Sequence, residues 1–235
     1  MPSRYFDKPK NYKMRFLKTS GFLLMSFAFI IMMYIFFPLV SWQIFLSNKF
    51  PLSNNQNSTS ATINETPLLN LFAGFKSVIT GTDFNNAKNW FPKVTIPKTK
   101  SASFTLSITK LGINNALVSS SDMNLDKHLV NFTSNFLPSP NSNLVILGLS
   151  SFPTFFKNGD YKTIFSKIYT LNVGDEIILN SNGQEYKYTV ENTTMIDPKD
   201  FSFLDPYNTY GNLTLVTLTP PGSVWKRLVI TAKIE

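Results

Sequence analysis

Cysteine is absent from this 235-residue sequence, and histidine occurs once, as His128. Without cysteine the chain can form no disulfide, no thiolate zinc site and no cysteine nucleophile. A single histidine also excludes a metal site built from several imidazole groups. The acidic residues of "DPKD" (197–200) and "GDE" (174–176) lack the dense Asp-x-Asp spacing of a calcium loop and are typical of turns. We therefore expect neither a metal nor another cofactor.

Charge is scarce outside one short segment. Residues 1–18 hold six of the 22 Lys and Arg residues and one of the 14 Asp and Glu residues, whereas the remaining chain holds 16 basic and 13 acidic residues. A nucleic-acid-binding protein needs a basic face on a folded domain. The near balance of charge after residue 18 therefore argues against a nucleic-acid partner.

A long uncharged run follows the basic segment. The sequence from residue 21 to residue 46 is apolar almost throughout, and no charged side chain occurs between residues 19 and 48. About 20 apolar residues in a helix cross the roughly 30 Å hydrocarbon core of a bilayer. Residues 19–48 are therefore predicted to form a transmembrane anchor, and a buried helix of a soluble core is the weaker alternative.

The anchor is predicted to be uncleaved. A cleaved signal peptide has a shorter apolar region that ends in small residues, whereas this run continues through Pro38, Trp42 and Phe45. Under the positive-inside rule, the basic residues 1–18 stay in the cytoplasm. The sequence thus predicts a single-pass plasma-membrane protein whose C-terminal domain lies outside the cell.

Two features are predicted between the anchor and the folded domain, over residues 49–94. Residues 53–65 are polar and rich in Asn, Ser and Thr, which is typical of a flexible stalk. Residues 67–80 carry apolar side chains at helical spacing, with Thr66 as a cap and Gly81 at the exit. This pattern predicts a short amphipathic helix that packs on the domain or, less favoured, on the membrane.

From residue 101 onward, short β-rich runs alternate with turn residues. Candidate strands occupy 103–109, 143–148, 176–180, 185–196, 213–219 and 227–234. "NVGD", "SNG", "DPKD" and "DPYN" mark turns between them. Many short strands with such turns predict a mostly β fold, a barrel or a sandwich, with few helices. The folded domain is expected over residues 95–235.

Five blocks occur in the order "LSITKLGINNALV", "NLVILG", "LNVGDEIIL" with "GQEYKYTV", "LTLVTLTP" and "KRLVITAKI". Together they resemble the sortase family, surface transpeptidases with a single N-terminal anchor, and the resemblance covers residues 101–235. It implies a closed β-barrel of about eight strands with few short helices and a substrate groove on its side. It also implies two kinds of partner, namely the membrane and a sorting-signal-like peptide or cell-surface protein.

The resemblance places the catalytic positions. Sortases attack a threonine carbonyl with a cysteine thiolate, use a histidine as acid and base, and stabilise the oxyanion with an arginine. The histidine follows the strand that matches "NLVILG", where this chain has Leu149, and the cysteine ends the strand that matches "LTLVTL", where it has Leu218. The arginine is retained as Arg227. The implied substrate groove therefore contains Leu149, Thr217, Leu218 and Arg227, without the catalytic Cys and His.

No nearby residue is a clear replacement for the lost groups. His128 lies well upstream of the matching histidine position and is predicted to be a surface histidine. The hydroxyls of Ser150, Ser151, Thr217 and Thr219 flank the two leucines. A hydroxyl, however, needs an adjacent base to become a useful nucleophile, and no histidine is available locally.

Two leucines at these positions are expected to pack together as an apolar floor, with Arg227 at its edge. For Arg227 two interpretations stay open: a contact to a carbonyl or carboxylate of a bound peptide, or a solvated charge at the end of a strand. The leading hypothesis is a membrane-anchored, extracytoplasmic sortase homologue that lacks transpeptidase activity and acts as a peptide-binding or scaffolding module.

Two alternatives to this hypothesis remain. One is a cysteine-independent hydrolase or transpeptidase with a Ser or Thr nucleophile. The other is a structural spacer in the cell envelope, for which the amphipathic segment 67–80 would be the contact.

Overall fold

The structure is a computed structural model that describes residues 20–34, 37, 83–92, 94, 102–133, 137–204, 211–221 and 223–235. The chain divides into two compact units, Met1–Leu46 and Ser47–Glu235. The basic segment 1–18 and the predicted stalk and amphipathic helix at 53–80 lie outside the described residues.

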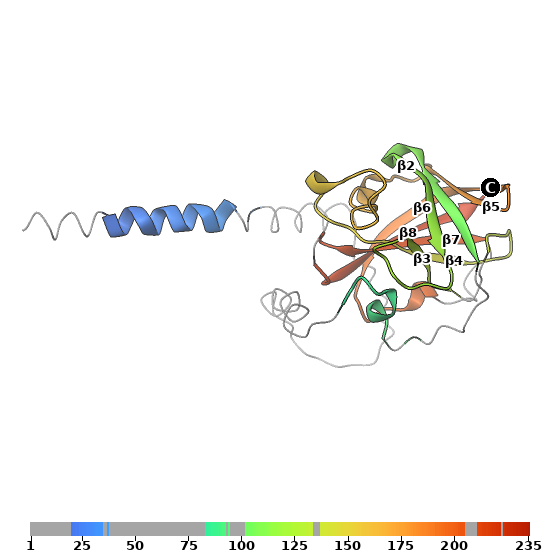
Figure 1. Cartoon of the computed structure of the whole chain (residues 1–235), viewed down its shortest axis with the longest axis horizontal. Helices are drawn as coiled ribbons and strands as arrows, with labels where there is room; N and C mark the ends of the chain where they lie inside the picture. The colour runs from blue at the N-terminus through green and yellow to red at the C-terminus, as the bar shows by residue number, and fades with distance from the viewer. Residues whose placement is uncertain are drawn as a thin grey trace, which may run out of the picture. The chain divides into compact units, whose positions relative to one another are not determined.

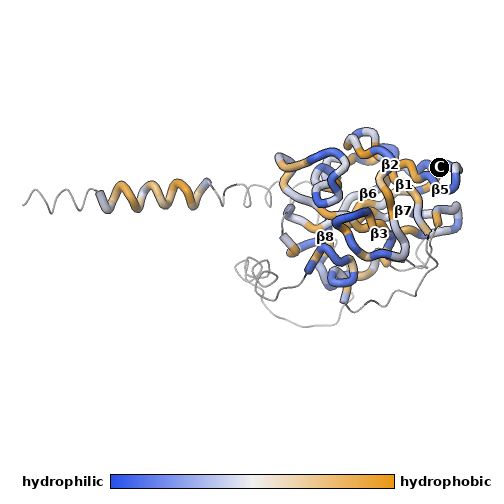
Figure 2. The backbone as a smooth tube through the Cα atoms, in the orientation of Figure 1, coloured by the Kyte–Doolittle hydropathy of each residue, from blue (hydrophilic) through white to orange (hydrophobic). Residues whose placement is uncertain are grey.

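In the first unit, residues 20–34 form a helix of mostly apolar residues (Figures 1 and 2). Its large side chains, such as Phe22, Leu23 and Met25, are exposed. Among the described residues, no helix has both the length and the apolar character needed to cross a membrane. Most of the rest of the predicted anchor, residues 38–48, lies outside the described residues.

The described part of the second unit is a closed barrel of eight strands in the order β1-β2-β3-β4-β7-β8-β6-β5 (Figure 1). The strands are β1 (Ser103–Ile108), β2 (Ile113–Ser119), β3 (Leu129–Asn131), β4 (Leu144–Leu147), β5 (Glu176–Ser181), β6 (Gln184–Ile196), β7 (Asn212–Thr219) and β8 (Lys226–Ile234). Two pairs, β2 with β3 and β4 with β7, are parallel. The other neighbours are antiparallel.

Helical structure in this unit consists of short 3₁₀ turns within the described ranges, η1 (Ala87–Trp90), η2 (Thr109–Leu111), η3 (Pro153–Phe155), η4 (Ile168–Thr170) and η5 (Ser202–Leu204). The prediction of a mostly β barrel with few helices is therefore confirmed. All six strands predicted from the hydrophobic pattern are present, with ends within one residue of the expected positions.

The pattern alone missed β2 and β3. β2 carries two consecutive asparagines, which are rare in strands, and the second of them, Asn115, has a positive φ of 49°. The pairing of β1 with β2 shifts register between Leu106 and Ile108, next to this residue. β3 has three residues, too few for a periodicity to be visible.

β4 and β7 lie at the centre of the sheet region that positions the site. Every residue of β4 is buried, and so are all residues of β7 after Asn212. Parallel strands that are covered on both faces have such continuous apolar sequences. Because side chains alternate along a strand, Leu144 and Ile146 face away from the side that carries Val145 and Leu147, which join a separate apolar cluster.

This cluster includes residues N-terminal to the expected start of the domain at 95. Residues 83–92, called here the cover segment, contain η1 and place Trp90 and Phe91 in the cluster. The Ala87 N–H donates to the Met123 carbonyl (2.9 Å), and the Leu125 N–H donates to the Asn85 carbonyl (2.7 Å). The cover segment is thus part of the folded unit, held by its own backbone to the loop before β3.

Candidate functional site

The segment after β4 and the end of β7 place Leu149 and Leu218 in the same cluster. The register pairs Leu147 with Val216 in parallel, and the Gly148 N–H continues the ladder by donating to the Val216 carbonyl (3.2 Å). Leu149 and Leu218 are 8% and 7% exposed and belong to one buried apolar cluster. They lie on neighbouring segments of the sheet.

Arg227 is the second residue of β8 and lies directly opposite Leu218 in the β7–β8 register. It is 2% exposed, so the interpretation as a solvated strand-end charge is wrong. Its Nη1 donates to the carbonyls of Val224 (3.1 Å) and Lys226 (3.3 Å), and its Nη2 donates to the Trp90 carbonyl (3.5 Å). The guanidinium carbon also lies 5.7 Å from the Trp90 ring centroid. The cover segment is therefore one reason why this arginine is buried.

The electrostatics of Arg227 are those of a buried charge with incomplete partners. Burial lowers its pKa to about 10, against the opposing influence of the Asp197 carboxylate. Within the described residues no carboxylate lies at ion-pair distance from it, and its buried Nε has no hydrogen-bond partner. The aromatic faces of Trp90 and Phe91 offset part of the desolvation by cation–π attraction. The Arg227 guanidinium can therefore donate a further hydrogen bond to a carbonyl or carboxylate oxygen.

Two of the hydroxyls that flank the leucines, those of Thr217 and Ser150, are engaged with the backbone. The Thr217 hydroxyl donates to the Gly148 carbonyl (2.8 Å), and the Ser150 hydroxyl donates to the Leu218 carbonyl (2.8 Å). The Ser151 N–H donates to the Ser166 hydroxyl (2.8 Å), which holds the next turn in place. The hydroxyls of Thr217 and Ser150 thus donate their protons to carbonyl oxygens, and not to a base that could accept a proton during catalysis.

Gly148 sets the path of the backbone into Leu149. A Cβ at this position would lie 2.5 Å from Phe165 Cε2 and 2.7 Å from Leu129 Cδ2. The Phe165 N–H donates to the Leu149 carbonyl (3.0 Å). The absence of a side chain at Gly148 therefore lets Phe165 pack against the end of β4 and fix the position of Leu149.

His128 is buried, and the prediction of a surface histidine is wrong. The side chain is 6% exposed, and its Nδ1 and Nε2 lie 3.0 Å from the Leu129 carbonyl and from Asp122 Oδ2. Both neighbours are hydrogen-bond acceptors. The hydrogen bond from His128 is the main cause that lowers the pKa of Asp122 below its usual 3.8. His128 braces the loop that docks the cover segment.

Sequence reasoning missed Trp90 and Phe91, which cover Arg227. The signal in the sequence was a pair of consecutive aromatic residues before a proline, inside an otherwise polar stretch. Phe91 also packs against Phe132, with ring centroids 5.3 Å apart. In the described ranges no three His, Asp or Glu side chains gather closely enough to hold a metal ion.

Comparisons with known proteins agree with this fold. A family model described as a sortase domain matches residues 94–235. The chain is similar to the pilus-related sortase C of Group B Streptococcus, with 19% identity over 73% of this chain and 92% of that one and a TM-score of 0.50. It is also similar to the sortase D5 transpeptidase of Clostridium perfringens, with 23% identity, 60% and 82% coverage and a TM-score of 0.47.

A search of curated protein sequences gave no significant match. The family model nevertheless spans more than half of the chain, and it covers all eight strands of the barrel described above. The chain belongs to the sortase family.

Proposed function

We propose that this sortase-family chain is a cell-surface protein without transpeptidase chemistry, which acts as a peptide-binding or scaffolding module. The observation that carries the proposal is the burial of Leu149 and Leu218, the residues that the sequence resemblance matches to the family's histidine and cysteine, in one apolar cluster beside Arg227. Two isobutyl groups supply neither a nucleophile nor a proton donor for the leaving amine. Arg227 alone can stabilise an oxyanion, but nothing at these positions generates one.

A serine or threonine nucleophile is the competing function, and the hydrogen bonds around the site disfavour it. The hydroxyls of Thr217 and Ser150 donate to backbone carbonyls. The imidazole of His128 is bound between the Asp122 carboxylate and the carbonyl of Leu129, the first residue of β3. Among the described residues, therefore, the hydrogen bonds show no base positioned to take a hydroxyl proton from either residue.

Peptide binding is proposed to use Arg227. Its bond to the Trp90 carbonyl is the longest of its three, at 3.5 Å, and its Nε is a buried donor without a partner. A peptide carbonyl or carboxylate that replaced the Trp90 carbonyl would form a charge-assisted hydrogen bond. Because the Trp90 and Phe91 rings lie over the guanidinium, a peptide at this place competes with the cover segment.

Attachment to the membrane is part of the proposal. The uncharged run at 19–48 and the basic residues 1–18 support a single-pass anchor with the barrel outside the cell. Such an anchor would hold the barrel where cell-surface proteins and their peptide segments are found.

The test is a peptide titration of the full-length chain in lipid nanodiscs, with ¹³C-labelled leucine methyl groups. We expect a sorting-signal-like peptide that contains threonine to shift the methyl signals of Leu149 and Leu218 saturably. Arg227→Gln is expected to weaken this binding about tenfold, the effect of one lost charge-assisted bond. Lys233→Gln, on the same strand but exposed, serves as the matched control and should leave the affinity unchanged.

The proposal fails in part if no peptide shifts these signals, because peptide binding at Arg227 is then excluded and scaffolding alone remains. It fails entirely if the unmodified chain cleaves the peptide.

A further inference from the structure

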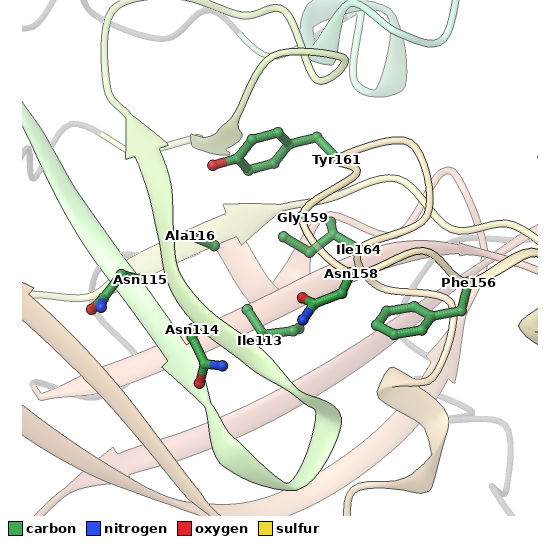
Figure 3. A pocket seen from close by; sticks show the side chains of 9 residues that line it. All are labelled: Ile113, Asn114, Asn115, Ala116, Phe156, Asn158, Gly159, Tyr161 and Ile164. Carbon is green, nitrogen blue, oxygen red and sulfur yellow. The ribbon is translucent and has the colours of Figure 1, made fainter.

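An open hollow of about 350 Å³ lies between the first half of β2 and the loop that follows β4 (Figure 3). We call it the β2 pocket. Ile113, Ala116 and Ile164 give it an apolar floor, and all three side chains are buried. None of its lining residues belongs to the cluster around Leu149 and Leu218. The β2 pocket is therefore separate from the site formed by Leu149, Leu218 and Arg227.

Hydrogen bonds hold the wall of the β2 pocket in place. The Thr163 hydroxyl accepts from the Lys157 N–H (3.0 Å) and lies 3.2 Å from the Lys157 carbonyl, which closes the loop on itself. The Leu117 N–H of β2 donates to the Tyr161 hydroxyl (2.9 Å), which ties the loop to the strand. Gly159, with a φ of 77°, permits the turn between them. A wall that is ordered in advance loses little conformational freedom when a ligand binds.

The polar groups at the β2 pocket are uncharged amides. Asn114 and Asn158 are exposed lining residues, and Figure 3 shows the Asn158 amide directed toward Ile113. Asn115 instead turns to β1, where the Ser107 hydroxyl donates to its Oδ1 (3.5 Å). An amide both donates and accepts hydrogen bonds, which suits the hydroxyl and amide groups of a neutral ligand.

No lining residue carries a carboxylate, an ammonium or a guanidinium group. The lining therefore offers no partner charge for an ionic ligand, whose burial without one is costly. Two aromatic rings, those of Phe156 and Tyr161, complete it. The Lys167 ammonium lies over the Phe156 ring, 4.2 Å from its centroid.

We propose that the β2 pocket binds one acetamido sugar residue of a neutral glycan. The apolar C–H face of the sugar ring packs on the Phe156 ring, and the acetamido methyl group lies on the floor formed by Ile113, Ala116 and Ile164. The amides of Asn114 and Asn158 exchange hydrogen bonds with the sugar hydroxyls and the acetamido group.

An extended peptide is a poorer match to the β2 pocket. Peptides that add to a strand need a free backbone edge and pockets for alternate side chains. Here the Tyr161 hydroxyl already occupies the Leu117 N–H on this edge of β2.

The experiment is a ¹H–¹⁵N NMR titration of the full-length chain in nanodiscs with the β-1,4-linked dimer of N-acetylglucosamine. We expect saturable shifts at Asn114, Asn158 and Gly159. Cellobiose, the same disaccharide scaffold without acetamido groups, should bind at least about tenfold more weakly. Phe156→Ala and Asn158→Ala are each expected to weaken binding of the acetamido dimer about tenfold. Gln184→Ala, an exposed amide on β6, is the matched control.

The proposal is overturned if the acetamido dimer causes no shifts at millimolar concentration, or if Phe156→Ala and Asn158→Ala bind it as well as the parent chain. Equal affinity for cellobiose, or tighter binding of a blocked alanine tripeptide at the same residues, also overturns it. Arg227→Gln leaves the β2 pocket intact, so sugar binding is expected to persist in that variant. A failure here is thus distinguishable from a failure of the proposed peptide site.

Discussion

Replacing Trp90 with alanine is expected to lower the free energy of unfolding of the barrel unit by about 3 to 5 kcal/mol, the range for truncation of a buried aromatic side chain. Trp90 is among the largest fully buried side chains. Its indole Nε1 donates to the Phe84 carbonyl (2.7 Å), which closes the cover segment on itself. The substitution removes this bond and leaves a cavity in the cluster that contains Leu149 and Leu218.

The same substitution is expected to expose Arg227 to water. The Trp90 ring and carbonyl both contact its guanidinium, and burial is what lowers the pKa of Arg227 to about 10. With the ring gone, the pKa should rise toward its usual value and the Nε–H should exchange faster with solvent. Chemical denaturation measures the loss of stability in Trp90→Ala. NMR hydrogen exchange at the Arg227 side chain measures the exposure of the guanidinium.

The matched control for Trp90→Ala is Phe155→Ala, because Phe155 is an aromatic residue that is 65% exposed. Its truncation is expected to change the free energy of unfolding by no more than about 0.5 kcal/mol. A loss below about 1 kcal/mol for Trp90→Ala would mean that the cover segment is not packed as described. Unchanged exchange at Arg227 would mean that Trp90 does not bury it.

Gly148→Ala is expected to destabilise the barrel by about 3 kcal/mol, the upper part of the usual range for overpacking a core. The new methyl group would lie 2.5 Å from Phe165 Cε2 and 2.7 Å from Leu129 Cδ2, and both side chains are buried. The backbone cannot easily move away, because the Gly148 N–H bonds to Val216 (3.2 Å) and its carbonyl accepts the Thr217 hydroxyl (2.8 Å). Thermal or urea unfolding measures the loss.

A double-mutant cycle separates this clash from other causes. Phe165→Leu removes the ring that the new methyl group meets, so the double variant Gly148→Ala/Phe165→Leu should be more stable than the sum of the two single losses predicts. The expected coupling is about 1 kcal/mol or more in favour of the double variant. Strictly additive losses would show that the methyl group does not meet Phe165.

The strands that the sequence predicted well are those with a clear hydrophobic pattern. β6, β7 and β8 are long and rich in β-branched and aromatic residues, so local pattern and tertiary pairing agree. β2 escaped the same reasoning because Asn114 and Asn115 interrupt its pattern. The second asparagine accommodates the positive φ at the irregularity with β1, a requirement that only the paired strand reveals.

The candidate site was predicted in part. The resemblance named Leu149, Leu218 and Arg227, and the structure places Leu149 and Leu218 in one buried cluster and Arg227 opposite Leu218. The cover segment has no such pattern, because it is held by backbone bonds to Met123 and to the Leu125 N–H. These partners are more than 30 residues away in the sequence, and their identity does not depend on side-chain type.

The burial of Arg227 and His128 could not be predicted from the local sequence either. A lone charged or polar residue carries no periodicity, and such residues are exposed in most proteins. Arg227 is buried by the aromatic rings of the cover segment, and His128 by a loop that folds back through Asp122. Both outcomes depend on contacts between segments that are distant in sequence.

The central claim is that two leucines remove the chemistry of an otherwise intact sortase barrel. Its most direct test is intact-protein mass spectrometry of the full-length chain and of its Leu149→His/Leu218→Cys variant, each incubated with a threonine-containing sorting peptide. We expect the parent chain to keep its mass and leave the peptide intact. The double variant should gain the mass of a peptide acyl group, weakly, because an imidazole beside the cysteine lowers the thiol pKa and Arg227 lies opposite residue 218. Cleavage by the parent chain that is lost in Thr217→Ala or Ser150→Ala would contradict the claim, and a folded but inert double variant would contradict the placement of the two positions.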